Sequence, residues 1–298
     1  MKLGTRGSQL ARWQAEWVRD CLAENGVAAE LVVIKTRGDA EVDRPLHELE
    51  GKGFFTKEIE DALLERRIDV AVHSLKDLPT ALPPGLALGA IPRRHDPREA
   101  LVNGTSLHAL APGTRIGTSS LRRVAQVRFL RPDLVVVPLR GNVPTRVRKV
   151  EARDGLDAAL LAIAGLERLD LGKHGSVVDP LEVMPAPGQG ALGIEVRDGD
   201  KATRKALQTL HDPASAVAVT AERALLAALG GGCQAPVAAY VGSGEQGAGS
   251  RLYGRVTAQD GSVQLTASAD IDPKHPEQAG ETVARLLEGE GAATLLAR

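Results

Sequence analysis

The chain repeats one pattern, in which a short β-rich run, a turn and an amphipathic helical stretch follow one another. In the first 90 residues the strand candidates are KLGTR, ELVVIKT, DVAVHS and LALGAI. Ser8 is placed to cap a helix that runs to about Glu24, and FTKEIEDALLERR predicts a second helix after the glycine loop EGKGF. Strands that alternate with helices are typical of an α/β domain with a mostly parallel sheet.

The same pattern returns in a second unit, which lies between two segments rich in chain breakers. IPRRHDPRE, with prolines at 92 and 97, predicts a crossing to another domain, and MPAPGQGALGIEV predicts the return crossing. Between them, RIGTSSLRRVAQVRFL, LVVVPLRGNVPTRVRKV and LDAALLAIAGLERL each combine a strand with a helix. Two crossings predict two α/β lobes that share a cleft. We expect the first lobe to comprise residues 1–92 and 191–209 and the second to comprise 97–185.

From about Pro213 the pattern changes to one helix, a glycine run, three strands and a last helix near Glu277 to Leu287. The pair Asp260-Gly261 is a strong hairpin signal between two of the strands. Residues 213–298 are therefore expected to form a third, α+β domain with a three-stranded antiparallel sheet.

Composition and cysteine spacing exclude several classes of protein. With 43% apolar and 25% charged residues, the 298-residue chain has ordinary globular composition. No apolar run approaches the roughly 18 residues of a membrane helix, and the first residues lack the apolar segment of a signal peptide. Cys21 and Cys233 match neither a disulfide framework nor a metal signature. We expect a cytoplasmic protein with free thiols, no membrane partner and no metal.

Positive charge is concentrated in the middle of a chain whose net charge is only −1. Residues 93–153 contain 13 Lys and Arg against 4 Asp and Glu. Such a stretch is either a solvated surface or a nucleic-acid face. An aromatic content of 2% leaves little material for stacking bases, so no nucleic-acid partner is expected.

Arginines and hydroxyl side chains recur where a strand gives way to a helix or loop, which is where open α/β sheets bind ligands. Free N–H groups at a helix start favour an anion, and arginine forks suit carboxylates or phosphates. The alternative, that the hydroxyls are plain helix caps and the arginines are surface charge, stays open for each position alone. Recurrence at four turns favours a polyanionic ligand; the residues are Arg6, Ser8, Thr118, Ser119, Ser120, Arg122, Arg123, Arg140, Arg146 and Arg168.

VAVHSLKDLPT ends an apolar strand in Ser74, Lys76 and Asp77, just before a proline. A carboxylate at the end of a strand, near many arginines, is a candidate acid, base or cation stabiliser. Alternatively, Asp77 caps the turn or pairs with Lys76, and His73 is a buried histidine with a partner.

The segment HELEGKGFFTKE combines two glycines with two of the three phenylalanines of the chain. This composition fits a mobile flap that carries Lys52 and a ring-stacking Phe55. Packing of the same phenylalanines into the core at the start of the next helix is the other interpretation.

Cys233 follows three glycines and comes shortly after the expected end of a helix. The negative end of a helix raises a thiol pKa, which is poor placement for a fast nucleophile. A glycine run permits exposure, so the thiol can be a fixed attachment point. A buried structural cysteine is the alternative, and we assign that role to Cys21.

Eight motifs carry a resemblance that spans the chain: TRGSQLA, KTRGD, GKGFFTKEIE, VAVHSLKDLPT, GTSSLRR, LRGNVPTR, PAPGQGALGIE and GGCQAP. In this order they resemble the porphobilinogen deaminase family, also called hydroxymethylbilane synthases, of the tetrapyrrole pathway. The resemblance implies three domains, of which the first two are similar to bacterial periplasmic binding proteins. It also implies a dipyrromethane cofactor attached to Cys233 through a thioether.

The resemblance further implies that four porphobilinogen units are joined, with loss of ammonia, before a linear hydroxymethylbilane is released by hydrolysis. Asp77 matches the catalytic aspartate of the family, and the enzyme is expected to be a monomer. By the same resemblance, the cofactor is held by Lys76, Thr118, Ser120, Arg122, Arg123, Arg140 and Arg146. The substrate is bound by Arg6, Ser8, Lys52, Phe55, Arg168 and Gln189.

A non-catalytic binding protein, either a two-lobed anion receptor of the periplasmic type or an effector domain of a regulator, is the competing interpretation. It explains the lobes and the arginines, but it leaves the third domain and Cys233 without a role.

Overall fold

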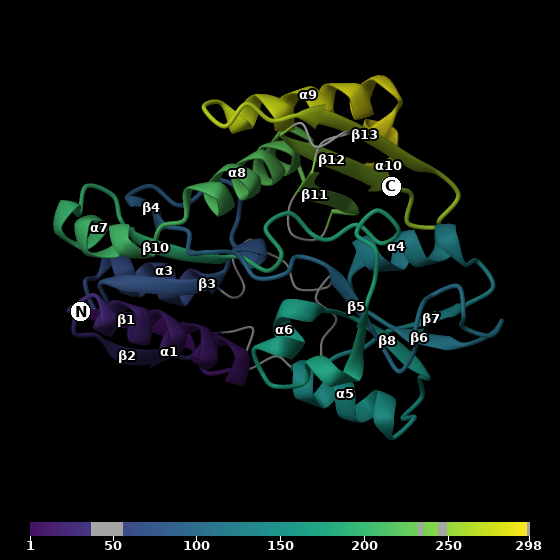
Figure 1. Ribbon diagram of the computed structural model, residues 1–298, viewed down its shortest axis with the longest axis horizontal. Helices are drawn as coiled ribbons and strands as arrows, with labels where there is room; N and C mark the ends of the chain where they lie inside the picture. Colours follow the sequence, from purple (N-terminus) through teal and green to yellow (C-terminus); the bar gives the residue numbers. More distant parts are fainter. Residues whose placement is uncertain (37–55, 232–234, 244–248, 297–298) are drawn as a thin grey trace. The chain divides into compact units, whose positions relative to one another are not determined.

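The computed structural model describes residues 1–36, 56–231, 235–243 and 249–296 (Figure 1). The predictions for Lys52, Phe55 and Cys233 lie outside these residues. The chain forms two compact units, which we call unit 1 (Met1–His95 and Gly190–Ala216) and unit 2 (Asp96–Gln189 and Val217–Arg298). The boundaries of the three expected domains stay predictions.

Unit 1 contains a five-stranded sheet in the order β2-β1-β3-β10-β4, formed by β1 (Lys2–Arg6), β2 (Glu30–Ile34), β3 (Val70–Ser74), β4 (Leu86–Ala90) and β10 (Leu192–Arg197). β1 pairs in parallel with β2 and β3, whereas β10 lies antiparallel between β3 and β4. The four strands expected in the first 90 residues are confirmed. A short connection cannot join neighbouring parallel strands, which is why β3 and β4 are not adjacent.

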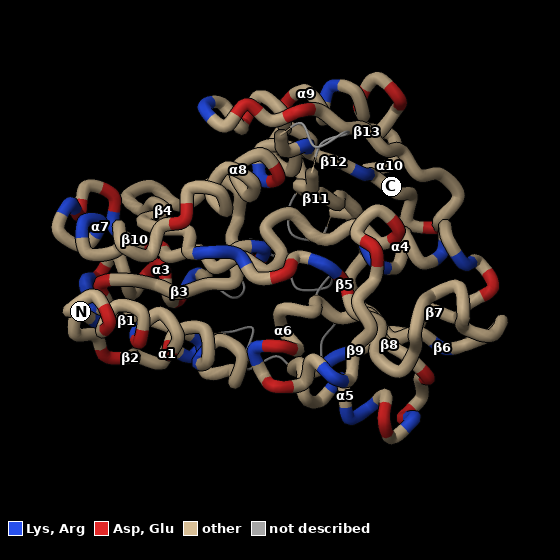
Figure 2. The backbone as a smooth tube through the Cα atoms, in the orientation of Figure 1, with Lys and Arg blue, Asp and Glu red and all other residues tan. Residues whose placement is uncertain are grey.

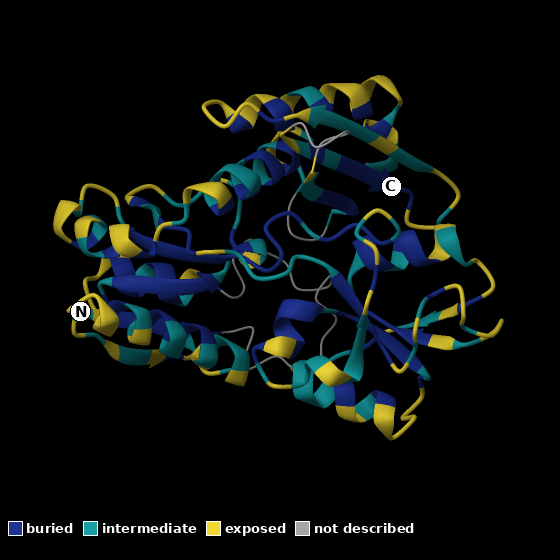
Figure 3. Cartoon of the chain, viewed as in Figure 1, coloured by how far each residue is buried: buried dark blue, intermediate teal, exposed yellow. Residues whose placement is uncertain are grey.

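Helices cover both faces of this sheet. α1 (Gln9–Glu24) begins at the predicted cap, because the Ser8 hydroxyl accepts from the backbone N–H of Ala11 at 3.3 Å. Its apolar side packs on the sheet together with side chains that follow α7 (Lys201–Leu207). α3 (Lys57–Leu64) packs on the opposite face. The inner strands β3 and β10 are accordingly buried on both sides (Figure 3).

The first sheet of unit 2 has the order β7-β6-β8-β5-β9, formed by β5 (Glu99–Val102), β6 (Arg115–Gly117), β7 (Val135–Val137), β8 (Ala158–Ala162) and β9 (Gly175–Val177). β6 pairs in parallel with β7 and β8, and β5 runs antiparallel between β8 and β9. The sheet thus repeats the arrangement seen in unit 1. β5 and β9 were not expected from the sequence, because neither is followed by a helix in the strand–turn–helix pattern that indicated β6, β7 and β8.

Three helices follow strands of this sheet, as the sequence predicts: α4 (Leu121–Leu130), α5 (Val143–Glu151) and α6 (Ile163–Glu167). α4 packs on one face, and α5 and α6 pack on the other. In Figure 2, many of the positive residues of the middle of the chain lie along α4, α5 and the turns before them.

The other sheet of unit 2 consists of β11 (Val237–Ser243), β12 (Ser250–Thr257) and β13 (Gln264–Asp270). All pairings in it are antiparallel, which confirms the expected three-stranded sheet. α8 (Pro213–Ala228), α9 (Pro276–Gly289) and α10 (Ala292–Leu296) pack against it around a core of their own.

The predicted turn at Asp260-Gly261 connects β12 and β13. The Asp260 carboxylate accepts from the backbone N–H of Ser262 at 2.9 Å, and Gly261 has a φ of +78°. A Cβ at Gly261 would lie 2.6 Å from the carbonyl carbon of Arg128 in α4. Only glycine combines this backbone conformation with such a close approach.

Among the described residues, no helix is both long enough and apolar enough to span a bilayer.

Candidate active site

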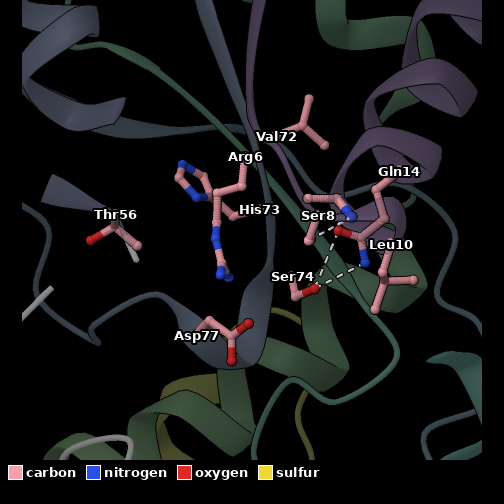
Figure 4. A pocket seen from close by; sticks show the side chains of 10 residues that line it. Arg6, Ser8, Leu10, Gln14, Thr56, Val72, His73, Ser74 and Asp77 are labelled. Carbon is pink, nitrogen blue, oxygen red and sulfur yellow. Dashed lines mark hydrogen bonds between the residues drawn. The ribbon is translucent and has the colours of Figure 1, made fainter. Parts of the chain in front are cut away.

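A cavity of about 70 Å³ opens in unit 1 at the ends of β1 and β3 (Figure 4). Parallel strands end at the same edge of their sheet, so the turns that follow β1 and β3 meet there. The cavity is lined by Arg6, Ser8, Leu10, Ala11, Gln14, Thr56, Val72, His73, Ser74 and Asp77. Three of the residues predicted from sequence, Arg6, Ser8 and Asp77, therefore share one pocket.

Arg6 is the last residue of β1, and its side chain extends across the pocket toward Asp77 (Figure 4). Ser8 stands at the start of α1, where its hydroxyl caps the helix. The cap and a binding role are compatible, because the hydroxyl oxygen accepts from Ala11 while its proton is left to donate.

Asp77 belongs to a short 3-10 helix, Leu75–Asp77, that follows β3 directly. Leu75 and Leu78 on either side are almost completely buried, at 0% and 1% exposure, whereas Asp77 is exposed. Two leucine anchors thus hold the backbone while the carboxylate faces the pocket. Lys76 is half-buried and is not among the residues that line the cavity.

One wall of the pocket has a polar pair that the sequence analysis did not find. The Gln14 amide donates to the Ser74 hydroxyl at 2.9 Å, and this bond ties α1 to the end of β3. The available signal was helical spacing, because Gln14 shares the buried side of α1 with Val18 and Leu22.

His73 lines the pocket and belongs to a group of buried ionisable side chains on the α3 face of the sheet. His73 Nε2 lies 3.1 Å from Glu195 Oε2, and both side chains are buried, which confirms the expected buried histidine with a partner. Glu60 of α3 is also buried. Burial raises the pKa of the Glu60 carboxyl, and the charge of Glu195 acts in the same direction. A glutamate inside an apolar strand, as in ALGIEV, was the missed signal for Glu195.

In unit 2, hydroxyl groups gather at the carboxyl ends of β6 and β7. Thr118 is buried directly after β6, and its hydroxyl accepts from the backbone N–H of Ser120, the residue that precedes α4. Ser119 exchanges hydrogen bonds of 3.0 Å with both backbone groups of Leu139 at the end of β7. Ser120 makes no side-chain cap bond to α4. The plain cap interpretation therefore holds for Ser8 and is not supported for Ser120.

Arg122 and Arg123 lie on α4 and are both buried, at 5% and 6% exposure. They are ion-paired to Glu99, with terminal nitrogens 2.7 Å from its two carboxylate oxygens. The interpretation of these residues as surface charge is wrong, because buried arginines require partners. Their cofactor role stays a prediction.

The remaining predicted arginines of unit 2 follow β7 and β8. Arg140 and Arg146 are half-buried, and the Arg146 Nε donates to the carbonyl of Gly141 at 2.8 Å. Arg168 follows α6 and is 5% exposed. Burial lowers the pKa of Arg168 to about 10, against the opposing effect of Glu167. Because β6, β7 and β8 are parallel, these residues belong to the same edge of the sheet as Thr118 and Ser120.

Gln189 is completely buried, and its amide donates to the carbonyl of Pro97 at 2.8 Å. This bond joins the two crossing segments within unit 2. The substrate role of Gln189 stays a prediction.

The donors of unit 2 fit an anionic cofactor such as dipyrromethane, which carries carboxylate side chains. Arg123 Nε is buried and has no hydrogen-bond partner among the described residues. Such a donor favours an incoming acceptor, because leaving it unpaired costs about 1 to 3 kcal/mol. In the described part of the chain, no group of three or more His, Cys, Asp or Glu side chains could hold a metal ion.

Solved structures with some similarity to the chain include a lipoprotein and a periplasmic substrate-binding protein. Immunogenic lipoprotein A from Vibrio vulnificus is 13% identical, with a TM-score of 0.42 over 72% of this chain and 96% of that chain. A periplasmic substrate-binding protein of an ABC transporter from Coxiella burnetii is 14% identical, with a TM-score of 0.43 over 72% of this chain and 94% of that chain. The strand orders described above define the fold.

Sequence comparisons give a family. The model described as porphobilinogen deaminase, dipyromethane cofactor binding domain, matches residues 1–205, and that of the porphobilinogen deaminase C-terminal domain matches residues 216–289. Porphobilinogen deaminase from Moorella thermoacetica is 48% identical, covering 99% of this chain and 95% of the relative. The protein of the same name from Syntrophotalea carbinolica is 48% identical, covering 100% and 95%. The chain therefore belongs to the porphobilinogen deaminase family, the hydroxymethylbilane synthases, which are transferases of tetrapyrrole biosynthesis that act on porphobilinogen with a dipyrromethane cofactor.

Proposed function

We propose that Asp77 is the catalytic residue of this hydroxymethylbilane synthase. When porphobilinogen loses ammonia, positive charge develops on its pyrrole ring, and a carboxylate beside that ring stabilises the charge. Asp77 is held for this task at the end of a buried strand, and its exposed carboxylate can also pass a proton to the departing amine.

The other residues of the pocket in unit 1 bind the substrate in this proposal. Porphobilinogen carries an acetate and a propionate, so a guanidinium and a hydroxyl are suitable donors. Arg6 and Ser8 supply them on the same side of the sheet edge as Asp77. Lys52, Phe55, Arg168 and Gln189 remain proposed substrate ligands on the strength of the family motifs.

The donors at the sheet edge of unit 2 hold the cofactor. Bound dipyrromethane supplies the free pyrrole carbon from which the chain of pyrroles grows. Its carboxylates are to be bound by Lys76 and by the unit 2 residues Thr118, Ser120, Arg122, Arg123, Arg140 and Arg146. Arginine forks and hydroxyls can fix the orientation of several carboxylates at once.

Cys233 is the proposed attachment point, through a thioether. Cys21, the other cysteine, is half-buried in α1, and burial raises the pKa of its thiol, helped by Glu24 and Asp20. Half-burial in α1 fits the structural role assigned to Cys21 and leaves Cys233, in the family motif GGCQAP, for the attachment.

The observation that carries this assignment is the pocket in unit 1. Local pattern alone left Asp77 as a turn cap, but the fold gathers Asp77, Arg6 and Ser8 around one cavity (Figure 4). An acid and an anion-binding pair in one pocket are what the loss of ammonia from a dicarboxylate requires.

We further propose that the enzyme is a cytoplasmic monomer. Two cysteines far apart suit a reducing compartment. In the described part of the chain the large exposed apolar side chains, such as Val33, Phe129 and Leu286, come from separate elements. Single exposed apolar residues are ordinary on monomers.

Intact mass under denaturing and reducing conditions tests the assignment. We expect the wild-type chain and Cys21→Ser to carry an added mass that maps to the peptide containing Cys233, and Cys233→Ser to lack it and to be inactive. An unmodified wild-type chain would support the anion receptor instead, and normal turnover by Cys233→Ser would refute the thioether.

A further inference from the structure

The cavity of unit 1 has two sides that differ in their chemistry. In the view of Figure 4, Ser8 and Leu10 lie on one side of the Arg6 side chain, whereas Thr56 and the ring of His73 lie on the other. Arg6 and Ser8 are donors, which suit carboxylates. The other side offers hydrogen-bond acceptors, and buried carboxyl groups adjoin it.

Thr56 lines the cavity, and its hydroxyl does not cap the helix that follows. The residue directly precedes α3, is 1% exposed and makes no side-chain cap bond. Its Oγ1 is buried and has no hydrogen-bond partner among the residues that the structure describes. Because buried hydroxyl groups normally find partners, Thr56 retains an oxygen that can accept from a group in the cavity.

His73, which also lines the cavity, is oriented from behind by Glu195. Its Nε2 lies 3.1 Å from Glu195 Oε2, and this is the one hydrogen bond that the ring makes to the described residues. A carboxylate only accepts, so the proton is on Nε2 and the second nitrogen of the neutral ring, Nδ1, is an acceptor. Glu195 thus determines which ring nitrogen can accept a hydrogen bond.

Two carboxyl groups give this side of the cavity a negative character. Glu195 alternates along β10 with Ile194 and Val196, which pack toward α1, so its side chain lies on the α3 face together with Glu60. Glu195 and Glu60 are 0% and 7% exposed, and Oε1 of each is buried without a hydrogen-bond partner in the described part of the chain. In a poorly solvated interior, such groups attract a nearby cation strongly.

Porphobilinogen carries one cation beside its two carboxylates. Its aminomethyl group is an aliphatic amine, which is protonated near neutral pH as the amine of lysine is. We propose that Thr56 and His73 form an amine subsite, in which Thr56 Oγ1 and His73 Nδ1 accept from this ammonium group, with Glu195 as the positioning residue of His73. The inference rests on the proposed function, because that function places the substrate in this cavity.

The amine subsite holds the leaving group of the reaction. When the C–N bond breaks, its electron pair stays on nitrogen, ammonia leaves with its three hydrogens, and the positive charge passes to the pyrrole ring beside Asp77. Hydrogen bonds from the ammonium to Thr56 and His73 fix the direction of this bond before it breaks. They also select an amine over a hydroxyl group, which has no charge and a single hydrogen to donate.

An analogue of porphobilinogen with a hydroxyl in place of the amino group tests this selection, because its ring and carboxylates are unchanged. We measure kcat/KM for porphobilinogen and the inhibition constant of the analogue in holoenzyme whose intact mass confirms the bound cofactor. The variants are Thr56→Val, Glu195→Gln and Arg6→Lys. Thr209→Val, at an exposed threonine of unit 1, is the matched control.

Thr56→Val is expected to lower kcat/KM for porphobilinogen about tenfold, because a hydrogen bond to a charged group is lost. The inhibition constant of the analogue is expected to change much less. Glu195→Gln should show the same preference, since it removes the buried charge and the constraint on the His73 ring. Thr56→Val replaces a hydroxyl by a methyl of similar shape, so it tests the amine subsite alone if Glu195→Gln does not fold.

Arg6→Lys is expected to weaken both ligands alike, because both carry the carboxylates that Arg6 binds. Equal losses for the two ligands in Thr56→Val, or values equal to those of Thr209→Val, would overturn the amine subsite. Discrimination that is lost in Thr56→Val but unchanged in folded Glu195→Gln would overturn the positioning role. Failure of the proposed function is a separate result, since Arg6→Lys would then bind both ligands as the wild type does.

Discussion

The position of Asp77 is fixed by the residues on either side of it. Leu75 and Leu78 are buried at 0% and 1% exposure, so the short helix that carries Asp77 is anchored on both sides. The backbone around Asp77 is therefore held in place by the buried side chains of Leu75 and Leu78.

Asp77→Asn is therefore expected to fold with a melting temperature close to that of the wild type. Turnover should fall by roughly 10² to 10⁴, the usual range for a lost acid–base group. Bilane formation and thermal melting are measured together, with Asp133→Asn, a surface partner of Arg131, as the control. Near-normal turnover in Asp77→Asn would leave only the turn-capping role.

The buried carboxyl of Glu60 in α3 makes the stability of unit 1 depend on pH. Its pKa is raised by burial, so the folded protein retains a proton that the unfolded chain loses at lower pH. The contribution of Glu60 to the free energy of unfolding therefore declines as the pH rises from the ordinary glutamate pKa through the raised one.

Glu60→Gln removes this titration. We expect the melting temperature of the variant, relative to wild type, to increase with pH across that window and to level off above it. Thermal melting between pH 4 and about pH 8 checks this, with the exposed Glu65→Gln at the end of α3 as the control. A constant difference at every pH would show that the pKa of Glu60 is the same in the folded and the unfolded chain.

At the scale of elements, the turn between β12 and β13 is predicted by its local sequence and also makes a tertiary contact. The sequence predicts the turn from Asp260-Gly261, and the structure shows that Gly261 also packs against the backbone of α4. The glycine is thus required both by its φ of +78° and by the contact.

Gly261→Ala is expected to destabilise unit 2 by about 1 to 3 kcal/mol, through left-handed strain together with overlap. Gly113→Ala is the matched control, because Gly113 has a φ of +79° but no atom within 4 Å of an added Cβ. Gly113→Ala should therefore lower the free energy of unfolding through backbone strain alone. If Gly261→Ala and Gly113→Ala lowered the free energy of unfolding equally in denaturant, the contact of Gly261 with α4 would make no contribution.

At the scale of the whole molecule, Arg255 connects the three-stranded sheet of unit 2 to α4 and to the segment that follows β9. From β12 it donates to the carbonyls of Leu181 and Glu182 at 2.7 and 3.0 Å and to Gln126 Oε1 at 2.9 Å. Burial lowers the pKa of Arg255 to about 10. Its donors satisfy the carbonyls of Leu181 and Glu182 and share Gln126 Oε1 with the Met184 N–H.

Arg255→Leu is expected to cost roughly 2 to 4 kcal/mol, since buried acceptors are left unpaired. We expect calorimetry to show the three-stranded sheet melting before the remainder of unit 2. Arg251→Leu on the same strand is the control, because its partner Asp270 is 74% exposed and such pairs contribute little. A single unshifted transition in Arg255→Leu would contradict a connecting role.

Much of the architecture could be predicted from the sequence because its signals are local. The cap at Ser8, the strand before Asp77 and the turn at Gly261 each depend on a few adjacent residues. β5 and β9 could not be predicted, because their stability comes from pairing with β8 and with each other rather than from their own short sequences.

The sequence by itself determined most of the strands and helices, and its motifs identified the family. Tertiary structure decided the partners of the charged residues: it brought Asp77 to Arg6 and Ser8, buried His73 against Glu195 and joined Glu99 to two residues of α4. Residue type fixes charge and local conformation, but burial and the choice of partner depend on pairing between strands far apart in the chain. Those pairings gain their free energy only when the sheet is assembled, so no local pattern encodes them.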